Sequence, residues 1–144
     1  MVQGDWSKLP QLMNQPVASG DTIDVVLNGY ELRRDMADQY AVTRPYYIYR
    51  LALIAHRDDD RILGWGDLLR KRDPKFQVGV LTGSVAMAYA EKGFDNQIHV
   101  AVSDDVSSAI GLVKDRNGQL DATIQDYPAF AYASKLPAFA DASG

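Results

Sequence analysis

The stretch FQVGVLTGS, residues 76–84, decides the fold that this sequence predicts. Its first six residues form a mostly apolar run of strand length, and the Thr-Gly-Ser that follows is typical of a tight turn. We expect a helix from about Ser84 to Lys92, with Gly93 after it. Its expected apolar face is made of Val85, Ala88 and Tyr89. A strand that turns directly into a helix is the first half of a β-α-β unit.

Two further strands of the same kind follow toward the C-terminus. Residues 98–102, Ile-His-Val-Ala-Val, and residues 120–125 are runs of strand length. Another helix is expected to begin at Asp126-Tyr127-Pro128, because proline suits the first turn of a helix. This alternation predicts an α/β fold with a parallel sheet and right-handed connections. The helix expected after Ser103 is predicted to bury Val106, Ala109, Ile110 and Val113.

The N-terminal half has weaker periodicities. Residues 23–27 predict a strand, and residues 32–39 predict one or two polar helical turns. Residues 45–55 predict a long strand that crosses between two bodies. After a solvated turn at residues 58–60, residues 63–69 predict a short helix or a loop. A first short helix is indicated by the spacing of Trp6, Leu9, Leu12 and Met13.

The composition excludes several classes of protein. The chain has 144 residues, of which 47% are hydrophobic and 24% charged, an ordinary globular balance. It has no cysteine, which excludes disulfides, zinc thiolate sites, iron–sulfur clusters and thiol catalysis. The net charge of -4 argues against a nucleic-acid partner, because such proteins are usually basic. No stretch approaches the ~18 apolar residues of a membrane span, and the first residues do not form a signal peptide.

Motifs for catalysis, metals and cofactors are missing from the sequence. The only histidines, His56 and His99, fall on separate predicted strands, and residues 58–60 lack the glycine and glutamate of a calcium loop. Gly83-Ser84 is not part of a Gly-x-Ser-x-Gly elbow, and no phosphate-binding glycine fingerprint is present. The sequence therefore predicts no metal, no cofactor and no catalytic residues.

Two positions remain as candidate binding groups. The helix that begins near Ser84 offers backbone N–H groups and a partial positive charge to a carboxylate, or it is an ordinary capped turn. Asp126 ends a predicted strand at the carboxyl edge of the sheet, where open α/β sheets bind ligands. Its carboxylate either binds an amine or caps the helix that begins at Tyr127. For the helix beginning and for Asp126, the binding role and the structural role both stay open. Asp121 is interpreted as a turn or surface residue.

Four segments resemble, in order and spacing, the bacterial extracellular solute-binding proteins of family 3, which serve polar amino-acid ABC transporters. The match covers roughly residues 6–134. The resemblance implies the two-lobed type II periplasmic-binding fold. The segments are the Gly-x-x-Asp strand at residues 20–30, Pro45-Tyr46-Tyr47, the strand and Gly-Ser turn at residues 78–84, and the Gly-x-x-Asp-Ala and Asp-x-Pro pattern at residues 117–128.

The resemblance also implies a division of the chain and a location. Residues 1–47 would be part of lobe 1, residues 48–56 a hinge strand, and residues 57–144 an incomplete lobe 2 with a parallel sheet. The chain would thus be the middle part of such a protein. A small amino-acid-like ligand would bind between the lobes, and the partner would be an ABC transporter permease. The expected location is periplasmic or at the outer face of the membrane, with membrane contact only through the permease.

The resemblance places six residues in the ligand site, of which Asp126 matches the family's ligand for the amino group. Two positions depart from the family's pattern. Met36 stands where the Thr-x-x-Arg motif has its carboxylate-binding arginine, so Arg33 or Arg34 would have to act from a shifted position. Val85 stands where the Gly-Ser-Thr turn has threonine. The six residues are Tyr30, Arg33, Gly83, Ser84, Val85 and Asp126.

The leading interpretation is a non-enzymatic solute-binding module for a small polar amino-acid-like ligand. One alternative is a truncated or degenerate sensor domain without a ligand, which Met36 favours. The other is a dehydratase-like enzyme on the same fold. That enzyme would need an acid and a base that face each other, and Asp126 is the only candidate for either.

Overall fold

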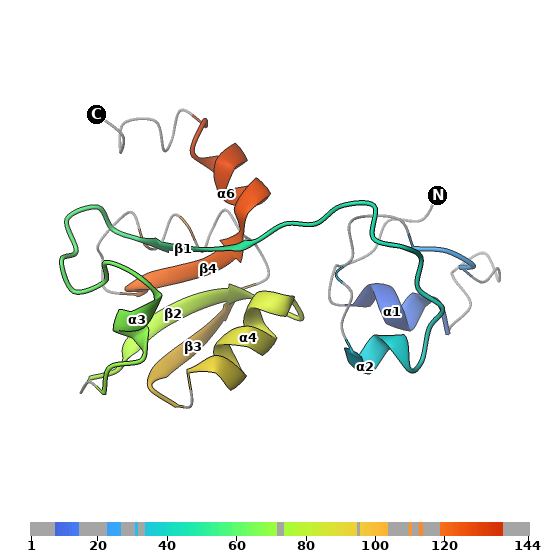
Figure 1. Ribbon diagram of the computed structural model, residues 1–144, viewed down its shortest axis with the longest axis horizontal. Coiled ribbons are helices and arrows are strands. Elements are labelled where there is room, and N and C mark those ends of the chain that lie inside the picture. The colour runs from blue at the N-terminus through green and yellow to red at the C-terminus, as the bar shows by residue number, and fades with distance from the viewer. Residues whose placement is uncertain are drawn as a thin grey trace. The chain divides into compact units, whose positions relative to one another are not determined.

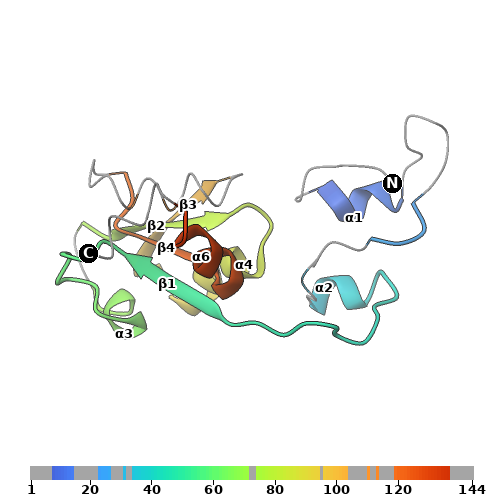
Figure 2. The same cartoon turned by 90° about the horizontal axis from the view of Figure 1, so that it is seen from above.

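The computed structural model describes residues 8–14, 23–26, 31, 34–71, 74–94, 96–103, 110, 113 and 119–136. The chain forms two compact units, Met1–Tyr47 and Ile48–Gly144. The second unit holds every described strand, and its sheet with the flanking helices is seen from two directions in Figures 1 and 2. None of the described helices is both long enough and apolar enough to cross a membrane.

The sheet of the second unit has the strand order β1-β4-β2-β3. β2 runs parallel to both of its neighbours, whereas β1 lies antiparallel to β4 at one edge. The prediction of an α/β fold with a parallel sheet is confirmed for β2, β3 and β4, whereas the antiparallel edge strand β1 was not predicted. The strands are β1 (Leu51–Ala55), β2 (Phe76–Leu81), β3 (Ile98–Ser103) and β4 (Ala122–Asp126).

Helix α4 (Val85–Gly93) follows β2 directly, as the sequence predicts. It begins there because the Ser84 hydroxyl accepts a hydrogen bond from a backbone N–H of the first turn. The predicted apolar face is wrong, since Ala86 and Ala90 are buried and Tyr89 is 45% exposed. The small alanine side chains let the helix approach the sheet closely, and the large ring is left at the rim.

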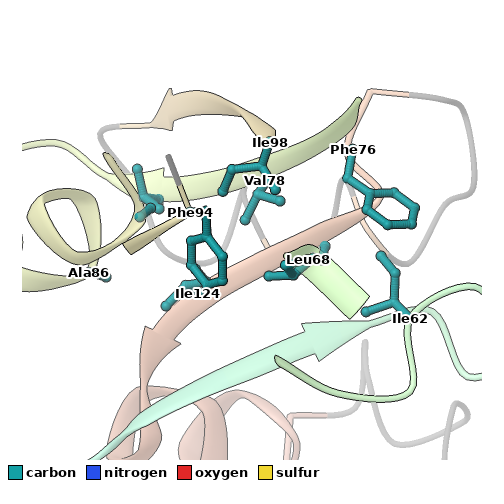
Figure 3. Close-up of a cluster of buried hydrophobic side chains, with 11 residues drawn as sticks. Ile62, Leu68, Phe76, Val78, Ala86, Phe94, Ile98 and Ile124 are labelled. Atoms are coloured by element: carbon teal, nitrogen blue, oxygen red, sulfur yellow. The ribbon is translucent and has the colours of Figure 1, made fainter. Parts of the chain in front are cut away.

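The hydrophobic core lies between one face of the sheet and the helices α3 (Trp65–Leu68) and α4, as Figure 3 shows. Alternate residues of β2 point into it, because successive side chains of a strand face opposite sides. The ring of Trp65 stacks on that of Phe94, with their centroids 6.3 Å apart. The buried members are Ile62, Leu68, Phe76, Val78, Val80, Ala86, Ala90, Phe94, Ile98, Ala122 and Ile124.

The opposite face of β4 carries two buried polar side chains, Thr123 and Gln125. The Thr123 hydroxyl donates to the backbone carbonyl of Gly79 at 2.9 Å and accepts from Gln125 Nε2 at 2.8 Å. A buried polar group is stable only when it has partners. These bonds therefore join β4 to β2 in addition to the backbone ladder.

The last described helix contacts β4 and β1. Helix α6 (Tyr127–Ala133) begins where β4 ends, with proline in its first turn as the sequence predicts. Ile110 and Val113 are helical and buried, also as predicted. The other two expected core positions of that helix, Val106 and Ala109, lie outside the described residues.

The first unit contains α1 (Leu9–Leu12) and α2 (Arg34–Ala37), both within the predicted segments. The strand predicted over residues 23–27 is wrong: residues 23–26 form no strand, and Val25 is 72% exposed. A strand exists only with a hydrogen-bonded neighbour, and the described part of this unit supplies none. Trp6 lies outside the described residues.

The strand predicted over residues 45–55 is only partly correct. Residues 45–50 belong to no strand, and β1 begins at Leu51, where pairing with β4 begins. Tyr46, Tyr47 and Ile48 are exposed. The boundary between the two compact units falls inside this exposed segment, between Tyr47 and Ile48.

Candidate functional site

The carboxyl edge of the sheet brings together three segments that are far apart in the sequence. β2 and β4 are parallel, with Gly79 level with Thr123, so both strands end at the same edge. The antiparallel β1 begins at that edge, with Leu51 opposite Asp126. Open α/β sheets bind ligands at this edge. The strand order sets the spatial order of the segments along this edge. Arg50–Leu51 comes first, Asp126–Tyr127 lies in the middle, and Thr82–Ser84 comes third.

The turn Thr82–Ser84 is held by the hydroxyl of Ser84. This hydroxyl donates to the Leu81 carbonyl at 2.8 Å and accepts from the backbone N–H of Met87 at 3.1 Å. Ser84 is 7% exposed, so its single O–H donor is committed to the fold. Gly83 has a φ of 72°, a left-handed conformation that glycine adopts without steric cost. The Gly83 N–H contacts Met87 Sδ at 3.5 Å, and the Ser84 N–H donates to the Leu81 carbonyl at 3.2 Å, so these groups also belong to the turn's own bonds.

Asp126 is the last residue of β4 and stands at the N-cap position of α6. Its side chain makes no capping hydrogen bond to that helix. The first N–H of the helix, on Tyr127, donates to the Arg50 carbonyl at 2.9 Å. The carboxylate is half-buried at the carboxyl edge. Of the two roles that the sequence leaves open, capping is therefore not the one that this side chain performs.

A cation that the sequence analysis missed lies at the same edge. The Arg50 guanidinium stacks on the Tyr127 ring, with 4.5 Å between its Cζ and the ring centroid. Arg50 is exposed, and among the described residues its side chain has no hydrogen-bond or ion-pair partner. No local motif singles out this arginine. The register of β1 against β4 places Arg50 level with Tyr127, one residue beyond Asp126.

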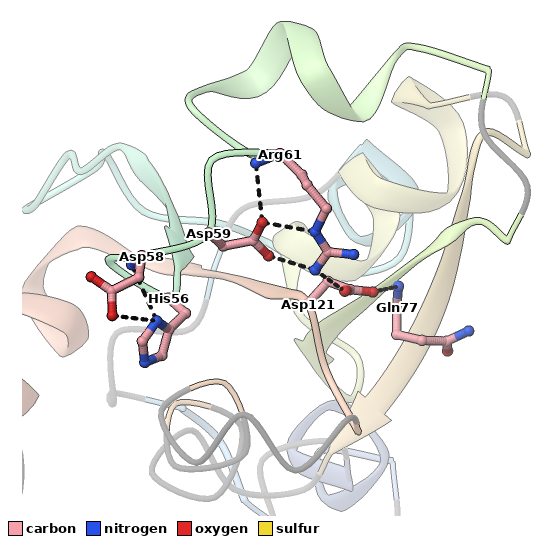
Figure 4. A network of polar contacts seen from close by, with 6 residues as sticks. All are labelled: His56, Asp58, Asp59, Arg61, Gln77 and Asp121. Atoms are coloured by element: carbon pink, nitrogen blue, oxygen red, sulfur yellow. Dashed lines mark hydrogen bonds and ion pairs between the residues drawn. The ribbon is translucent and has the colours of Figure 1, made fainter.

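The opposite edge of the sheet holds a polar network centred on Arg61, which Figure 4 shows. The guanidinium donates to the two Asp59 oxygens at 2.8 and 2.6 Å and to Asp121 Oδ1 at 2.7 Å. The hydrogen bonds to Asp59 and then to Asp121 raise the pKa of Arg61 above its ordinary value. Asp121 Oδ2 also accepts from the backbone N–H of Gln77 at 2.8 Å. The network thus ties the loop after β1 to the beginnings of β2 and β4.

This network corrects two predictions about aspartates. The prediction of a solvated turn at residues 58–60 is wrong for Asp59, because its side chain is only 10% exposed and is paired with Arg61. Asp121 is a half-buried bridging residue and not merely a turn or surface residue. A pocket of about 350 Å³ lies beside these side chains and His56. It lies at the other end of β4 from Asp126, so it is separate from the predicted ligand edge.

Four of the six predicted ligand residues are described by the structure. Gly83 and Ser84 form the turn, Val85 begins α4, and Asp126 ends β4 on the neighbouring strand. Tyr30 and Arg33 lie outside the described residues, and Met36 is in α2 of the first unit. Over the ranges that the structure describes, no three His, Asp or Glu side chains converge as a metal site requires.

Known structures resemble this chain, whereas no family model and no curated protein sequence matches it. An ancestral arginine-binding protein bound to arginine is 27% identical to this chain, with a TM-score of 0.72. The match covers 93% of this chain and 55% of that protein's chain. An ancestral amino acid-binding protein, a precursor of cyclohexadienyl dehydratase, is 21% identical to this chain, with a TM-score of 0.73. The match covers 93% of this chain and 55% of that protein's chain.

A third structure of the same kind comes from Streptococcus pneumoniae. It is an amino acid ABC transporter substrate-binding protein bound to L-arginine. Its chain is 16% identical to this one, with a TM-score of 0.71, and the match covers 94% of this chain and 52% of that protein's chain. The chain described here has the type II periplasmic-binding fold of the family 3 solute-binding proteins. It spans about half the length of the solved structures that it matches.

Proposed function

We propose that this chain is a solute-binding module of an amino-acid ABC transporter, with a small amino-acid-like ligand at the carboxyl edge of the sheet. The observation that carries the proposal is the position of Asp126. Its carboxylate stands at the ligand-binding edge of an open α/β sheet and is not used to cap the helix that follows. The amino-acid ligands of the similar solved structures support the same class of ligand.

The proposed ligand uses its two charged groups on neighbouring strands. Its ammonium group binds the Asp126 carboxylate, and its carboxylate binds at the beginning of α4, next to the turn at Gly83. The two ends lie on adjacent strands, about 4.8 Å apart, which suits groups carried on a single carbon atom. Gly83 has no Cβ, so the ligand can approach the backbone closely.

The remaining assignments are proposals that follow from the likeness to two-lobed proteins. Residues 1–47 correspond to part of lobe 1, residues 48–56 to a hinge strand and residues 57–144 to lobe 2. The division into units after Tyr47 supports the first boundary. The partner is an ABC transporter permease, in the periplasm or at the outer face of the membrane.

Isothermal titration calorimetry with the twenty amino acids and their decarboxylated amines tests the proposal. We expect amino acids to bind and simple amines to bind far more weakly, because amines lack the carboxylate. Asp126→Asn should weaken binding by about 1–3 kcal/mol, as the loss of a charge-assisted hydrogen bond does. Asp60→Asn at the opposite edge is the matched control. If Asp126→Asn and the control leave the affinity equally unchanged, Asp126 is not in the site.

A second variant tests the turn independently of Asp126. Gly83→Asn adds a side chain at the ligand approach, and asparagine tolerates the left-handed φ better than other residues do. We expect this variant to keep its fold and to lose ligand affinity. Full affinity in the folded variant would show that the ligand does not approach the turn.

An enzyme on the same fold is the second candidate, because one similar structure is a precursor of cyclohexadienyl dehydratase. Dehydration would need an acid and a base that face the substrate. Among the described residues at the carboxyl edge, Asp126 is the only acidic side chain. Incubation with hydroxylated acids and detection of a dehydrated product tests this candidate directly.

A further inference from the structure

An exposed surface that is both apolar and basic lies around helix α3 and the C-terminal end of α4. We propose that this surface, called the α3 surface below, docks on an anionic phospholipid membrane. The inference does not depend on the ligand site, and it adds a direct membrane contact to the one expected through the permease. The surface consists of two exposed leucines and four exposed basic residues, Leu63, Leu69, Arg70, Lys71, Lys75 and Lys92.

The Asp67 carboxylate holds the two ends of α3 and the first cation together. Its Oδ2 atom accepts hydrogen bonds from the backbone N–H groups of Leu63 and Gly64 at 2.9 and 3.0 Å. Its Oδ1 atom pairs with Arg70 Nη1 at 3.2 Å. Leu63 precedes the helix and Leu69 is its C-cap residue, so the two leucines flank α3. An apolar side chain and a cation are therefore bound to opposite oxygens of one carboxylate.

The two leucines project from a rigid base. Leu63 is 84% exposed and Leu69 is 55% exposed. The helix between them is fixed through Trp65, whose ring makes an edge contact with Tyr89 at 5.7 Å and stacks on Phe94 at 6.3 Å. A single exposed leucine is ordinary on a protein surface, but apolar side chains grouped beside cations mark an interaction surface.

Three lysines extend the positive charge around the leucines. Lys71 and Lys75 are exposed in the loop between α3 and β2. Lys92 is three residues after Tyr89 in α4, so it lies on the side of that helix that meets Trp65. Among the described residues no carboxylate pairs with any of these lysines. Their charges are therefore available to an anionic partner.

The nearest acidic side chains do not cancel this charge. Asp67 already forms three contacts within the surface. Glu91 does not share the face of Lys92, because consecutive residues of a helix do not face each other. The net charge of the chain is -4, but charges more than about 10 Å away are largely screened at physiological salt. The local excess of basic residues decides what this surface attracts.

The aspartate-lined pocket belongs to the other face of the sheet. Leu120 lines that pocket, and a side chain at Gly79 would contact both Leu120 and Thr123. Thr123 lies on the face opposite the core, whereas α3 and α4 cover the core face. The basic α3 surface and the acidic pocket are thus on opposite sides of the sheet. This asymmetry favours an orientation with the α3 surface toward an anionic membrane.

A phospholipid surface fits these features better than an acidic protein does. A headgroup layer is fluid and yields around projecting leucines, whereas a protein would need pockets that match them. Lysine and arginine side chains can keep their stems on apolar surface while their charged ends reach the phosphates. Basic residues near an anionic membrane and apolar side chains buried in it both contribute to binding.

Cosedimentation of the full chain with phospholipid vesicles tests the inference. We expect binding to vesicles made of equal parts of phosphatidylglycerol and phosphatidylcholine, little binding to phosphatidylcholine alone, and loss of binding at high salt. Lys71→Gln should weaken binding about fivefold, as the loss of one cation at an anionic surface does. Lys135→Gln, an exposed lysine that follows α6, is the matched control and should leave binding unchanged.

A second pair of variants tests the apolar contact. Leu63→Gln should weaken vesicle binding about tenfold, because it removes an aliphatic side chain that the membrane buries. Ile48→Gln is the matched control, since Ile48 is 86% exposed and precedes β1 at the carboxyl edge of the sheet. Both side chains are exposed, so we expect urea denaturation curves that match the unmodified chain. A matching curve assigns any loss of binding to the membrane contact.

The other outcomes overturn the inference. A chain that does not bind the anionic vesicles at low salt has no such surface. Binding that Lys71→Gln and Leu63→Gln leave unchanged assigns the contact to another part of the molecule. Lysine-dependent binding to soluble polyglutamate without vesicle binding assigns the surface to an acidic protein. None of these variants changes Asp126, so amino-acid affinity in calorimetry should stay unaltered, and the proposed function is tested separately.

Discussion

Asp121 and Gln77 form a reciprocal pair of hydrogen bonds, although 44 residues separate them in the sequence. The Gln77 N–H donates to Asp121 Oδ2 and the Asp121 N–H donates to the Gln77 carbonyl, both at 2.8 Å. The other carboxylate oxygen of Asp121 accepts from Arg61 at 2.7 Å. One aspartate therefore aligns the beginnings of two parallel strands and anchors the loop after β1.

The first prediction concerns this aspartate. Asp121→Ala should lower the free energy of unfolding by about 1–3 kcal/mol, because it leaves the Gln77 N–H and one donor of Arg61 without their acceptor. Urea denaturation measures the effect. The control Asp60→Ala removes an exposed carboxylate of the same neighbourhood and should change the stability by less than about 0.5 kcal/mol. Equal effects of the two substitutions would contradict a bridging role.

The second prediction concerns the cap of α4. Ser84→Ala should cost about 1 kcal/mol of stability, since it removes both the bond to Met87 and the bond to Leu81. Ligand affinity should change little, because the hydroxyl is committed to the turn. Ser134→Ala, which removes an exposed hydroxyl after α6, should have a smaller effect on thermal unfolding. A large loss of affinity in a stable Ser84→Ala variant would assign the hydroxyl to the ligand instead.

The third prediction concerns the buried hydroxyl of Thr123. Thr123→Val keeps the shape of the side chain but leaves the Gly79 carbonyl and the Gln125 amide without their partner. We expect a loss of about 1–3 kcal/mol in urea denaturation. Thr43→Val, an exposed threonine of the first unit, should be nearly neutral. A neutral Thr123→Val variant would mean that this hydroxyl does not help to hold β2 and β4 together.

The fourth prediction concerns the distribution of stability along the chain. Backbone amides of residues 1–55 should exchange with deuterium faster overall than those of residues 76–130, since slow exchange follows buried, paired strands. Residues 23–26 and 45–50 have no strand pairing, whereas Val78, Val80 and Ile124 are fully buried. Hydrogen exchange read by mass spectrometry, with the mass in solution known, checks this. Equal protection of both halves would contradict it.

The sequence predicted the second unit better than the first, for a local reason. Residues 76–81 form the strand that their apolar run predicts, and Ser84 caps the next helix as its side chain allows. The apolar run and the helix cap each depend on residues that are close together in the sequence. Residues 23–26 look like a strand by composition but form none, because a strand needs a partner that composition does not supply.

The apolar face of α4 and the pairing of Asp59 with Arg61 show the same limit. Helical periodicity allowed a face with Tyr89, but the closeness of the sheet selected Ala86 and Ala90. Three consecutive aspartates predict exposure, yet Arg61 folds back on Asp59 and reaches Asp121. Packing and long-range charge pairs decide these positions, and neither is encoded in local spacing.

The sequence by itself determined the alternation of strands and helices, the turn at Gly83 and Ser84, and the position of Asp126 at a strand end. These features depend on backbone conformation and capping, which act over a few residues. Only the tertiary structure decided that Arg50, Asp126 and the turn share one edge, because the antiparallel and parallel registers set this neighbourhood. Register is a property of two strands together, and no single stretch of sequence contains it.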